Sequence, residues 1–234
     1  MTESQTQTFT LGLPFRARSR LMALLIVVSA LSVGAFLSWH FSRFATTTLS
    51  PPKLAQRADR TNTSRWLYGH PEARFSVLEY ADLECPYCRA YFPVLRQWID
   101  LHPQVNWEWH YLPLSVHDPA ATREARLAEC AGEVGGTRAF WRSLAWIYEH
   151  TDGDGSGLPA GVELPGTNQE LRACMASTRP DAVVRSHVQA AAAEKIEVTP
   201  TLRLEDHRSG KTLTLHGPVE GDSLLSAFDL LASE

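Results

Sequence analysis

Two cysteines lie three residues apart in the stretch DLECPYCRA, residues 82–90, and they are the residues of this chain best suited to chemistry. Cys85 and Cys88 enclose the dipeptide Pro86-Tyr87. A pair at this spacing has three chemical uses. It can be half of a metal site, it can form a structural disulfide, or it can open and close as a redox pair.

A metal site would need further ligands, and the sequence offers none at a suitable spacing. Tetrahedral zinc takes a second Cys-x-x-Cys or two histidines a few residues apart. Cys130 and Cys174 stand alone, and no His-x₃-His run occurs. A structural Cys85–Cys88 bridge would close so short a loop that it adds little stability. A redox pair that needs no metal and no cofactor is therefore the favoured interpretation.

The sequence around the pair predicts the tip of a helix. The stretch RFSVLEYAD is typical of a strand that ends near Ala81, and Pro86 suits the first helical position. Cys85 would then be the N-cap, where free N–H groups and the helix dipole lower a thiol pKa from about 8.5 to about 3.5–7.5. Cys88, deeper in the helix, would keep its proton. Cys85 would attack or be attacked, and Cys88 would resolve the mixed disulfide.

The pattern along the chain predicts strand–helix–strand, a helical block at about 117–196, and then strand–strand–helix. QVNWEWHYLPL alternates as a second strand, EVTPTLRLED and KTLTLHG indicate two more, and DSLLSAFDLLASE indicates a closing helix. Such an order forms one central sheet with helices on its faces. The helical block would be an insertion at one end of this sheet.

The residues before the predicted domain suggest a membrane anchor. Residues 1–20 form a polar tail that ends in three arginines, and the next 19 residues carry no charge. At about 1.5 Å per residue this apolar run spans about 30 Å, the thickness of a bilayer core. We expect an anchor at 21–41 and a linker at 42–66. The arginines should stay in the cytoplasm, so the domain at 67–234 should face outward.

A cleaved signal peptide is the alternative for the apolar run. Its core would be about 7–15 residues long and would precede a small-x-small cleavage site, whereas this run is longer and SWHFSRF is a poor cleavage site. A buried soluble helix is a third interpretation, although no nearby segment would cover it. Both main interpretations predict an extracytoplasmic domain. The anchor predicts a single-pass protein of the inner (cytoplasmic) membrane, with its catalytic domain in the periplasm or at the cell exterior.

The stretch YGHPEARFSVLEYADLECPYC resembles the start of the DsbA-like thiol:disulfide oxidoreductases, a branch of the thioredoxin superfamily. AECAGEVGGTRAFWRSLAWIY, LRACMAS and VTPTLRL follow in the order of that branch. The resemblance covers about residues 68–234. It implies an α/β, thioredoxin-like fold with an inserted helical domain.

The resemblance also implies roles outside the cysteine pair. Thr199-Pro200 matches the family's cis-proline, which lies opposite the active site and would leave the backbone of Thr199 free to pair with a peptide beside Cys85. Glu79 matches a buried acid that could accept the proton of Cys88. The alternative for Glu79 is an edge-facing glutamate in a half-exposed strand.

Substrate contact is predicted for Pro86, Tyr87 and Thr199, which would border a peptide-docking groove. Two features differ from the best-known oxidases of the family. Pro-Tyr replaces Pro-His between the cysteines, and Glu84 brings a negative charge next to Cys85. Both should raise the pKa of Cys85 and make the pair less oxidising than the strongest oxidases.

The two remaining cysteines fall on predicted helices of the inserted block. In an oxidising compartment two leftover cysteines often pair, so we favour a structural disulfide between Cys130 and Cys174. Two buried free thiols are the alternative.

We therefore predict an oxidoreductase that exchanges disulfides with cysteines of exported polypeptides and is reset by a redox partner, most readily as an oxidase. A reductase or isomerase would run the same parts in reverse. A non-catalytic chaperone module would tolerate Cys85→Ser, and a metallochaperone would bind copper or zinc through the pair. The net charge of −4 argues against nucleic acid as a partner.

Overall fold

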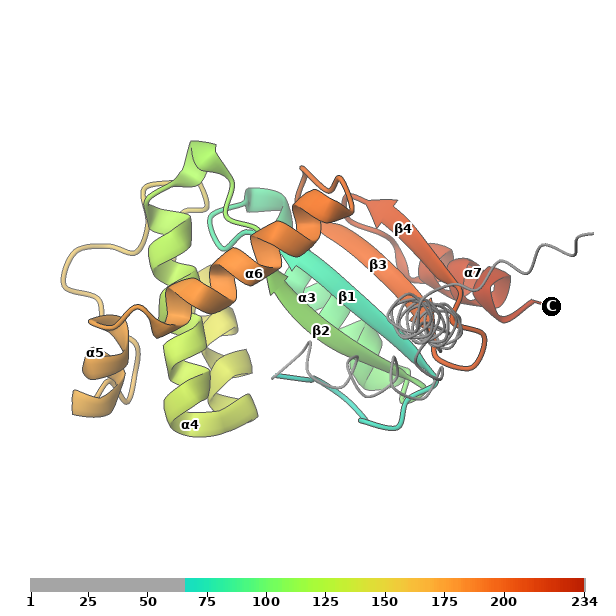
Figure 1. The fold of residues 1–234 in the computed structure, drawn as a ribbon, viewed down its shortest axis with the longest axis horizontal. Helices are drawn as coiled ribbons and strands as arrows, with labels where there is room; N and C mark the ends of the chain where they lie inside the picture. Colours follow the sequence, from blue (N-terminus) through green and yellow to red (C-terminus); the bar gives the residue numbers. More distant parts are fainter. Residues whose placement is uncertain (1–65, 234) are drawn as a thin grey trace, which may run out of the picture. The chain divides into compact units, whose positions relative to one another are not determined.

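The computed structural model describes residues 66–233 of the chain (Figure 1). The predicted tail at 1–20, the anchor at 21–41 and nearly all of the linker at 42–66 lie outside the described residues and stay predictions. Within 66–233, no helix combines the length and the apolar character needed to span a bilayer.

A four-stranded sheet forms the centre of the described fold, with the strand order β2-β1-β3-β4. The strand β1, Phe75–Ala81, pairs in parallel with β2, Val105–Tyr111, and antiparallel with β3, Thr201–Asp206. The strand β4, Thr212–His216, completes a hairpin with β3. The parallel unit followed by a hairpin is the arrangement that the sequence predicts.

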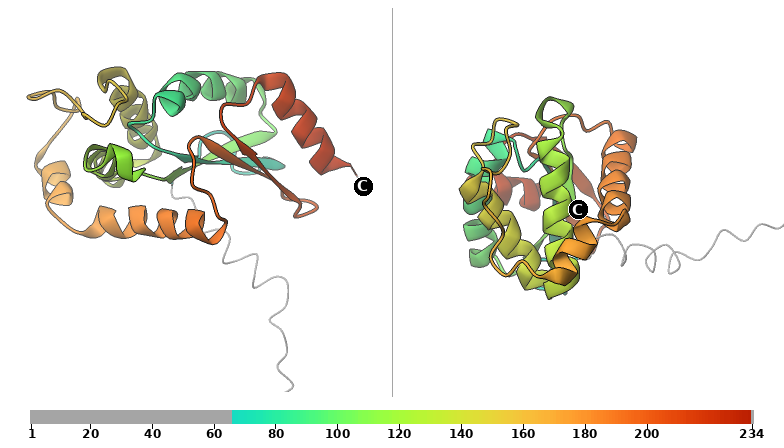
Figure 2. Two further views of the ribbon diagram at one scale, coloured as in Figure 1. Left: turned by 90° about the horizontal axis from the view of Figure 1, so that it is seen from above. Right: turned by 90° about the vertical axis from the view of Figure 1, so that its left-hand side faces the viewer.

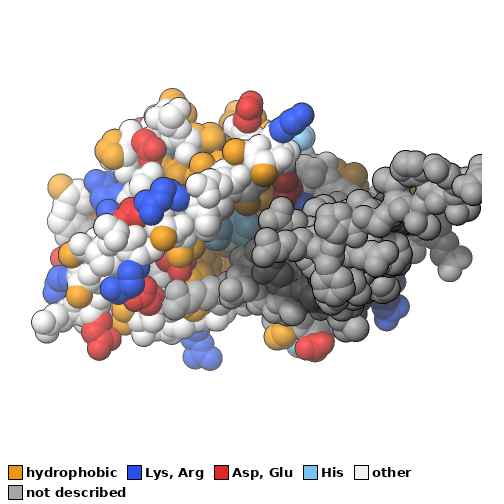
Figure 3. Space-filling model, in the orientation of Figure 1, with side chains coloured by type: hydrophobic (Ala, Val, Ile, Leu, Met, Phe, Trp, Pro, Cys, Tyr) orange, Lys and Arg blue, Asp and Glu red, His pale blue; other side chains and the backbone are white. Residues whose placement is uncertain are grey.

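Helices cover both faces of the sheet. The helices α3, Pro86–Leu101, and α7, Gly221–Ala232, lie on one face, and α6, Arg179–Ala193, crosses the other face (Figure 2). The buried residues of α7 recur at the spacing of an amphipathic helix; they are Leu224, Ala227, Phe228 and Leu231. Around α6, side chains of both charges are interspersed on the face shown in Figure 3, so neither sign dominates there.

The helical block lies between β2 and β3, as predicted. It begins with the short turn η1, Ser115–His117, and continues through α4, Ala120–His150, and α5, Gln169–Met175, to α6. Gly136 interrupts α4 with a φ of 72°, a left-handed conformation that glycine adopts without a side-chain clash. The two halves of α4 are therefore separate helical stretches.

Trp66 belongs to the folded domain, so the predicted linker ends one residue too late. The Trp66 ring stacks on Phe140 with 5.6 Å between centroids, and its indole N–H donates to Glu129 Oε2 at 2.9 Å. Two residues later, Tyr68 exchanges backbone hydrogen bonds with Trp107 of β2. Burial of a large aromatic side chain is strongly favourable in free energy, and this explains why Trp66 packs into the core.

Candidate active site

Cys85 is the N-cap of α3, as the sequence predicts. Its backbone is extended, with φ −84° and ψ 122°, and Pro86 begins the helix. The N–H of Arg89 donates to the Cys85 carbonyl at 3.0 Å and closes the first turn. Cys85 and Cys88 are both free thiols. The structure therefore represents the reduced form of the pair.

The environment of Cys85 favours the thiolate. The pKa of Cys85 is lowered to about 6, mainly by a hydrogen bond from the Cys88 thiol. Burial opposes this shift, whereas hydrogen bonds from Thr199 and from the backbone N–H groups of Cys88 and Tyr87 add to it. This value lies within the range predicted for a thiol at a helix N-terminus.

The environment of Cys88 has the opposite effect. Its side chain is 0% exposed, and burial raises the pKa of Cys88 well above its ordinary value. The hydrogen bond to Cys85 and the charge of Glu79 act in the same direction. The two thiols of one motif therefore differ in protonation, which is the division of labour expected of an attacking and a resolving cysteine.

Glu79 is fully buried in the central strand β1, so the alternative of a half-exposed edge residue is wrong. Burial raises the pKa of Glu79 to about 8, the Trp107 indole offsets part of the shift, and the charge of Cys85 adds to it. The charge of Glu79 in turn acts on Cys88, which places the acid in electrostatic reach of the buried thiol. An acid with a pKa near neutral pH is well suited to pass a proton.

The Thr199–Pro200 peptide bond is cis, as the resemblance implies, and it lies beside the redox pair. Cys85 Sγ is 3.5 Å from the carbonyl oxygen of Thr199, within reach of a hydrogen bond from the thiol. Tyr87 is 65% exposed and Val198 is 51% exposed, so two apolar side chains face solvent on the segments that meet at Cys85.

A second set of residues fixes the turn before Cys85, and the sequence did not reveal it. Asp82 is buried and accepts hydrogen bonds from the N–H of Glu84 at 2.8 Å and the N–H of Leu114 at 2.9 Å. Its Oδ2 also lies 2.7 Å from His117 Nδ1, and its carbonyl accepts from the Tyr148 hydroxyl at 3.1 Å. An acidic residue directly after a predicted strand was the available signal for Asp82. Its partners lie far away in the sequence, and no sequence signal identified them.

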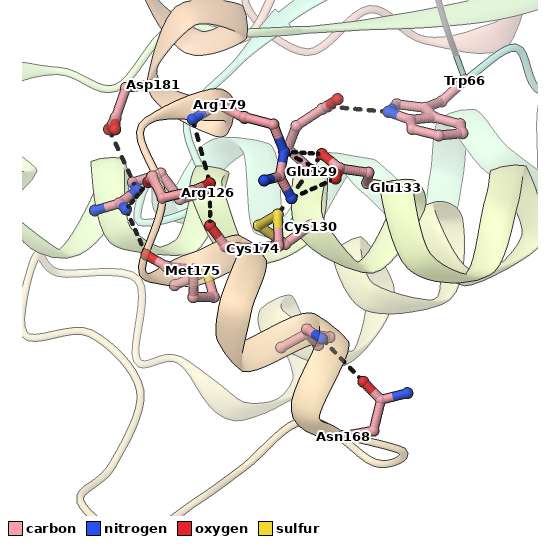
Figure 4. The surroundings of a disulfide bond; sticks show 12 residues. Trp66, Arg126, Glu129, Cys130, Glu133, Asn168, Cys174, Met175, Arg179 and Asp181 are labelled. Carbon is pink, nitrogen blue, oxygen red and sulfur yellow. Dashed lines mark hydrogen bonds and ion pairs between the residues drawn. A yellow bond between two sulfur atoms is a disulfide. The ribbon is translucent and has the colours of Figure 1, made fainter.

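A disulfide joins Cys130 of α4 to Cys174 of α5, the pairing favoured from the sequence (Figure 4). Both cysteines are fully buried. Around the disulfide, Arg179 contacts Glu133 at 2.6 Å, and Arg126 donates to the Met175 carbonyl at 2.6 Å. These contacts bind the start of α6 and the end of α5 to α4, so the disulfide is part of the frame of the helical block.

Comparisons with known proteins agree with this fold. Residues 60–218 match the family described as Thioredoxin. The crystal structure of DsbA2 from Pseudomonas aeruginosa is 41% identical and superposes with a TM-score of 0.69, covering 71% of this chain and 93% of that chain. The thiol-disulfide exchange protein alpha-DsbA2 from Wolbachia pipientis is 13% identical and shares the fold, with a TM-score of 0.58 over 76% of this chain and 94% of that chain.

One curated relative is much longer than this chain. The Na(+)/H(+) antiporter NhaA 3 of Salinispora tropica is 31% identical over 161 residues, which cover 68% of this chain and 23% of the antiporter. The likeness is therefore to part of that protein. Together with the helix-tip dithiol, the family match over most of the sequence shows that the chain belongs to the thioredoxin family, as a DsbA-like thiol:disulfide oxidoreductase.

Proposed function

We propose that this chain oxidises cysteine pairs of exported polypeptides outside the cytoplasm. The observation that carries the proposal is the unequal protonation of the two thiols. The pKa of Cys85 is lowered to about 6, whereas the pKa of Cys88 is raised well above its ordinary value. A stabilised thiolate favours the reduced form of the pair, and a pair that prefers to be reduced is an oxidant of other thiols.

The proposed reaction is two successive thiol–disulfide exchanges. A substrate thiolate attacks Cys85 Sγ of the oxidised pair, and the Cys85–Cys88 bond breaks while a mixed disulfide forms. Cys88 leaves as a thiolate and takes a proton, which Glu79 supplies. A second substrate thiolate then attacks the substrate sulfur of the mixed disulfide and releases Cys85 as a thiolate. The substrate has lost two electrons to the pair, and a partner with a stronger disulfide oxidant restores Cys85–Cys88.

The size of the driving force follows from the Cys85 pKa. With its pKa lowered from 9.0 to about 6, Cys85 is mostly ionised at pH 7. Ionisation then stabilises the reduced form by a factor of about ten, which is about 1.4 kcal/mol or about 30 mV for two electrons. This increment moves the pair toward an oxidase. Pro-Tyr between the cysteines, instead of Pro-His, should keep it below the strongest oxidases.

Substrate recognition is proposed for the residues around Cys85. The exposed ring of Tyr87 and the backbone of Thr199 border the sulfur, and Pro86 begins the helix beside them. An extended peptide would pair with the Thr199 backbone and rest its apolar side chains on Tyr87.

A location at the inner membrane is part of the proposal. It is supported by the uncharged run within residues 21–41 and by the arginines before it. We propose that the chain has a tail at 1–20 and one span at 21–41. A linker at 42–65 would lead to a catalytic domain in the periplasm or at the cell exterior.

The reduction potential of the full-length chain tests the direction of the reaction. Equilibration with glutathione should give a value well above that of thioredoxin, about −270 mV. Oxidation of a dithiol peptide should then exceed reduction of insulin. A potential near that of thioredoxin, with rapid insulin reduction, would favour the reductase or isomerase instead. Peptide binding that survives Cys85→Ser, with no exchange in the parent chain, would favour the chaperone module.

A further inference from the structure

Glu84, the residue before Cys85, has an unusual environment. Its side chain is 0% exposed, although it carries a carboxylate. The Thr151 hydroxyl donates to its Oε1, and the N–H groups of Gly155 and Gly157 donate to its Oε2 at 2.9 Å and 3.2 Å. All three donors belong to the loop that follows α4. One buried carboxylate therefore binds this loop to the active-site turn.

A second carboxyl group meets Glu84 from α4. Glu124 is also 0% exposed, and its Oε1 accepts from the N–H of Leu158 at 3.0 Å. Burial and the contact with Glu84 raise the pKa of Glu124 to about 9. Burial alone would raise the pKa of Glu84, but hydrogen bonds from Glu124 and from the loop lower it below its ordinary value.

Two carboxyl groups in contact inside a protein do not both ionise. Glu84 has three donors from the loop and Glu124 has one, so the negative charge is better solvated on Glu84. The Oε2 of Glu124 is buried and accepts no hydrogen bond from the described residues, so the single proton belongs there and is donated to Glu84. Without this proton the pair would be two buried anions in contact, and the loop could not be held in place.

The loop held by Glu84 lies against the first turn of α3. A Cβ atom on Gly153 would be 3.5 Å from the Cα of Pro86, so the two backbones are in contact. The guanidinium of Arg89 donates to the carbonyl of Asp152 at 3.1 Å and to that of Tyr148 at 2.8 Å. The loop is thus packed on the helix tip that carries Cys85.

We propose that Glu84 is a positioning residue of the redox site, and that Glu124 must carry a proton for Glu84 to do so. The carboxylate of Glu84 holds the loop at residues 151–157 against the tip of α3. This contact keeps the backbone N–H groups of Tyr87 and Cys88 directed at the sulfur of Cys85. The position of the helix tip affects the Cys85 thiolate in the same way whether the cysteine pair oxidises or reduces its substrate.

A positioning role for Glu84 and simple charge repulsion predict opposite changes in the pKa of Cys85 when Glu84 is replaced by glutamine. If Glu84 acted only as a nearby negative charge, its neutralisation in Glu84→Gln would lower the pKa of Cys85. If Glu84 positions the helix tip, the same change removes the charge and one of the two acceptor oxygens that hold the loop. The loop is then held less tightly and the pKa of Cys85 rises. The other charged or titratable groups around the loop and the helix tip are unchanged in every variant; they are Glu79, Asp82, Arg89, His117 and Arg123.

The test is the pH dependence of Cys85 alkylation by iodoacetamide in the reduced full-length chain. The variants are Glu84→Gln, Glu124→Ala and Glu124→Gln, with Glu149→Gln as a control that removes the same charge from an exposed site on α4. The glutamine at 124 can still donate to Glu84, whereas alanine cannot. Equilibration with glutathione gives the reduction potential of each variant, and thermal unfolding reports stability separately.

We expect Glu84→Gln and Glu124→Ala to raise the alkylation pKa by about one unit, which means about tenfold less thiolate below pH 6. Glu124→Gln and Glu149→Gln should match the parent within twofold. A fall in the pKa of Cys85 in Glu84→Gln overturns the proposal, as does an identical response of the two Glu124 variants. Should Glu84→Gln fail to fold, the contrast between alanine and glutamine at position 124 decides alone.

Discussion

At the scale of single residues, the Cys85 sulfur depends on donors supplied by its neighbours. The largest is the thiol of Cys88, which keeps its proton because it is buried and donates it toward Cys85. The two pKa values are therefore linked, since the proton that Cys88 retains is the one that stabilises the Cys85 thiolate.

Replacing Cys88 should show this link. Cys88→Ala removes the main donor and should raise the pKa of Cys85 from about 6 by about one to two units. Cys88→Ser keeps an O–H donor and should give a smaller rise. Titration of the thiolate absorbance near 240 nm measures both variants, which contain one titrating thiol. Equal values of about 6 in both would contradict the assignment of Cys88 as the main donor.

Glu79 predicts a loss of stability at alkaline pH. Its folded-state pKa of about 8 exceeds the ordinary 4.5, so the folded state binds the proton more tightly than the unfolded chain. The contribution is fully present below about pH 4.5 and is lost as the pH rises through about 8. Glu79→Gln should exceed the parent in unfolding free energy by about 1–3 kcal/mol at pH 9, but little at pH 5.

Urea unfolding of the reduced proteins at the two pH values measures this difference, with Glu149→Gln as the exposed control. Glu79→Gln should also slow exchange by about tenfold or more, because the leaving Cys88 thiolate loses the group that supplies its proton. An unchanged exchange rate would remove Glu79 from the mechanism while leaving its effect on stability.

Residues near the motif were predictable from the sequence, whereas their distant partners were not. Cys85, Cys88 and Glu79 lie within ten positions of one another, and local pattern and resemblance identified them. Glu124 lies 39 positions after Cys85 on an ordinary-looking helix. Its contact with Glu84 exists only because the loop after α4 returns to the tip of α3, which no local pattern specifies.

At the scale of elements, a pair of histidines joins α6 to β2. The rings of His187 and His110 stack with 4.0 Å between centroids, and His187 Nδ1 accepts from the Tyr111 N–H at 3.2 Å. Burial, followed by the proximity of His110, lowers the pKa of His187 to about 3. The contact between helix and sheet therefore requires a neutral His187.

This requirement predicts acid sensitivity of the α6 contact. A depressed histidine pKa gives stability that is present above about pH 6.5 and is lost as the pH falls from there toward about 3, at up to about 1.4 kcal/mol per pH unit. His187→Asn retains an acceptor for Tyr111 but does not titrate. Its unfolding free energy should fall less than that of the parent between pH 7 and pH 4 in denaturant titrations. Equal slopes would show that His187 is not the responsible group.

The disulfide predicts a separation between stability and exchange. Replacing Cys130 and Cys174 together by alanine opens a link across 44 positions and should cost about 2–4 kcal/mol, measured as a lower guanidinium midpoint. The reduction potential of Cys85–Cys88 should stay the same. A large change in that potential would mean that the helical block also adjusts the redox site.

Elements were predicted where periodicity is strong. The helical pattern at about 117–196 indicated the block that contains α4, and the alternation in β2 indicated a strand. The second cis bond, Asp118–Pro119, was not foreseen, because the residues around an X-Pro bond rarely reveal its isomer.

At the scale of the whole molecule, the order of strands and helices was sufficient to predict the sheet, because a parallel crossover followed by a hairpin leaves few arrangements. The placement of the helical block against the redox pair was not predictable. It depends on contacts such as Arg89 with the end of α4, which join segments about 60 positions apart.

The proposed anchor predicts where the pair reacts in a cell. A membrane-impermeant maleimide should label Cys85 of the reduced chain in intact spheroplasts, and deletion of residues 2–41 should abolish this labelling by leaving the domain in the cytoplasm. Labelling of the full chain only after lysis would place the domain on the cytoplasmic side. Labelling of Cys85→Ser under the same conditions measures the background.

The burial of the Cys130–Cys174 disulfide has a consequence for counting electrons. Cys85 keeps a small exposed surface of 3%, whereas both cysteines of the link between α4 and α5 are 0% exposed, so a dissolved reductant has access at Cys85 and not at the link. The native chain should therefore take up two electrons from a mild thiol and release four thiols only after unfolding. A redox titration of the intact protein would then describe a single couple, and its midpoint could be assigned to one bond without replacing any cysteine.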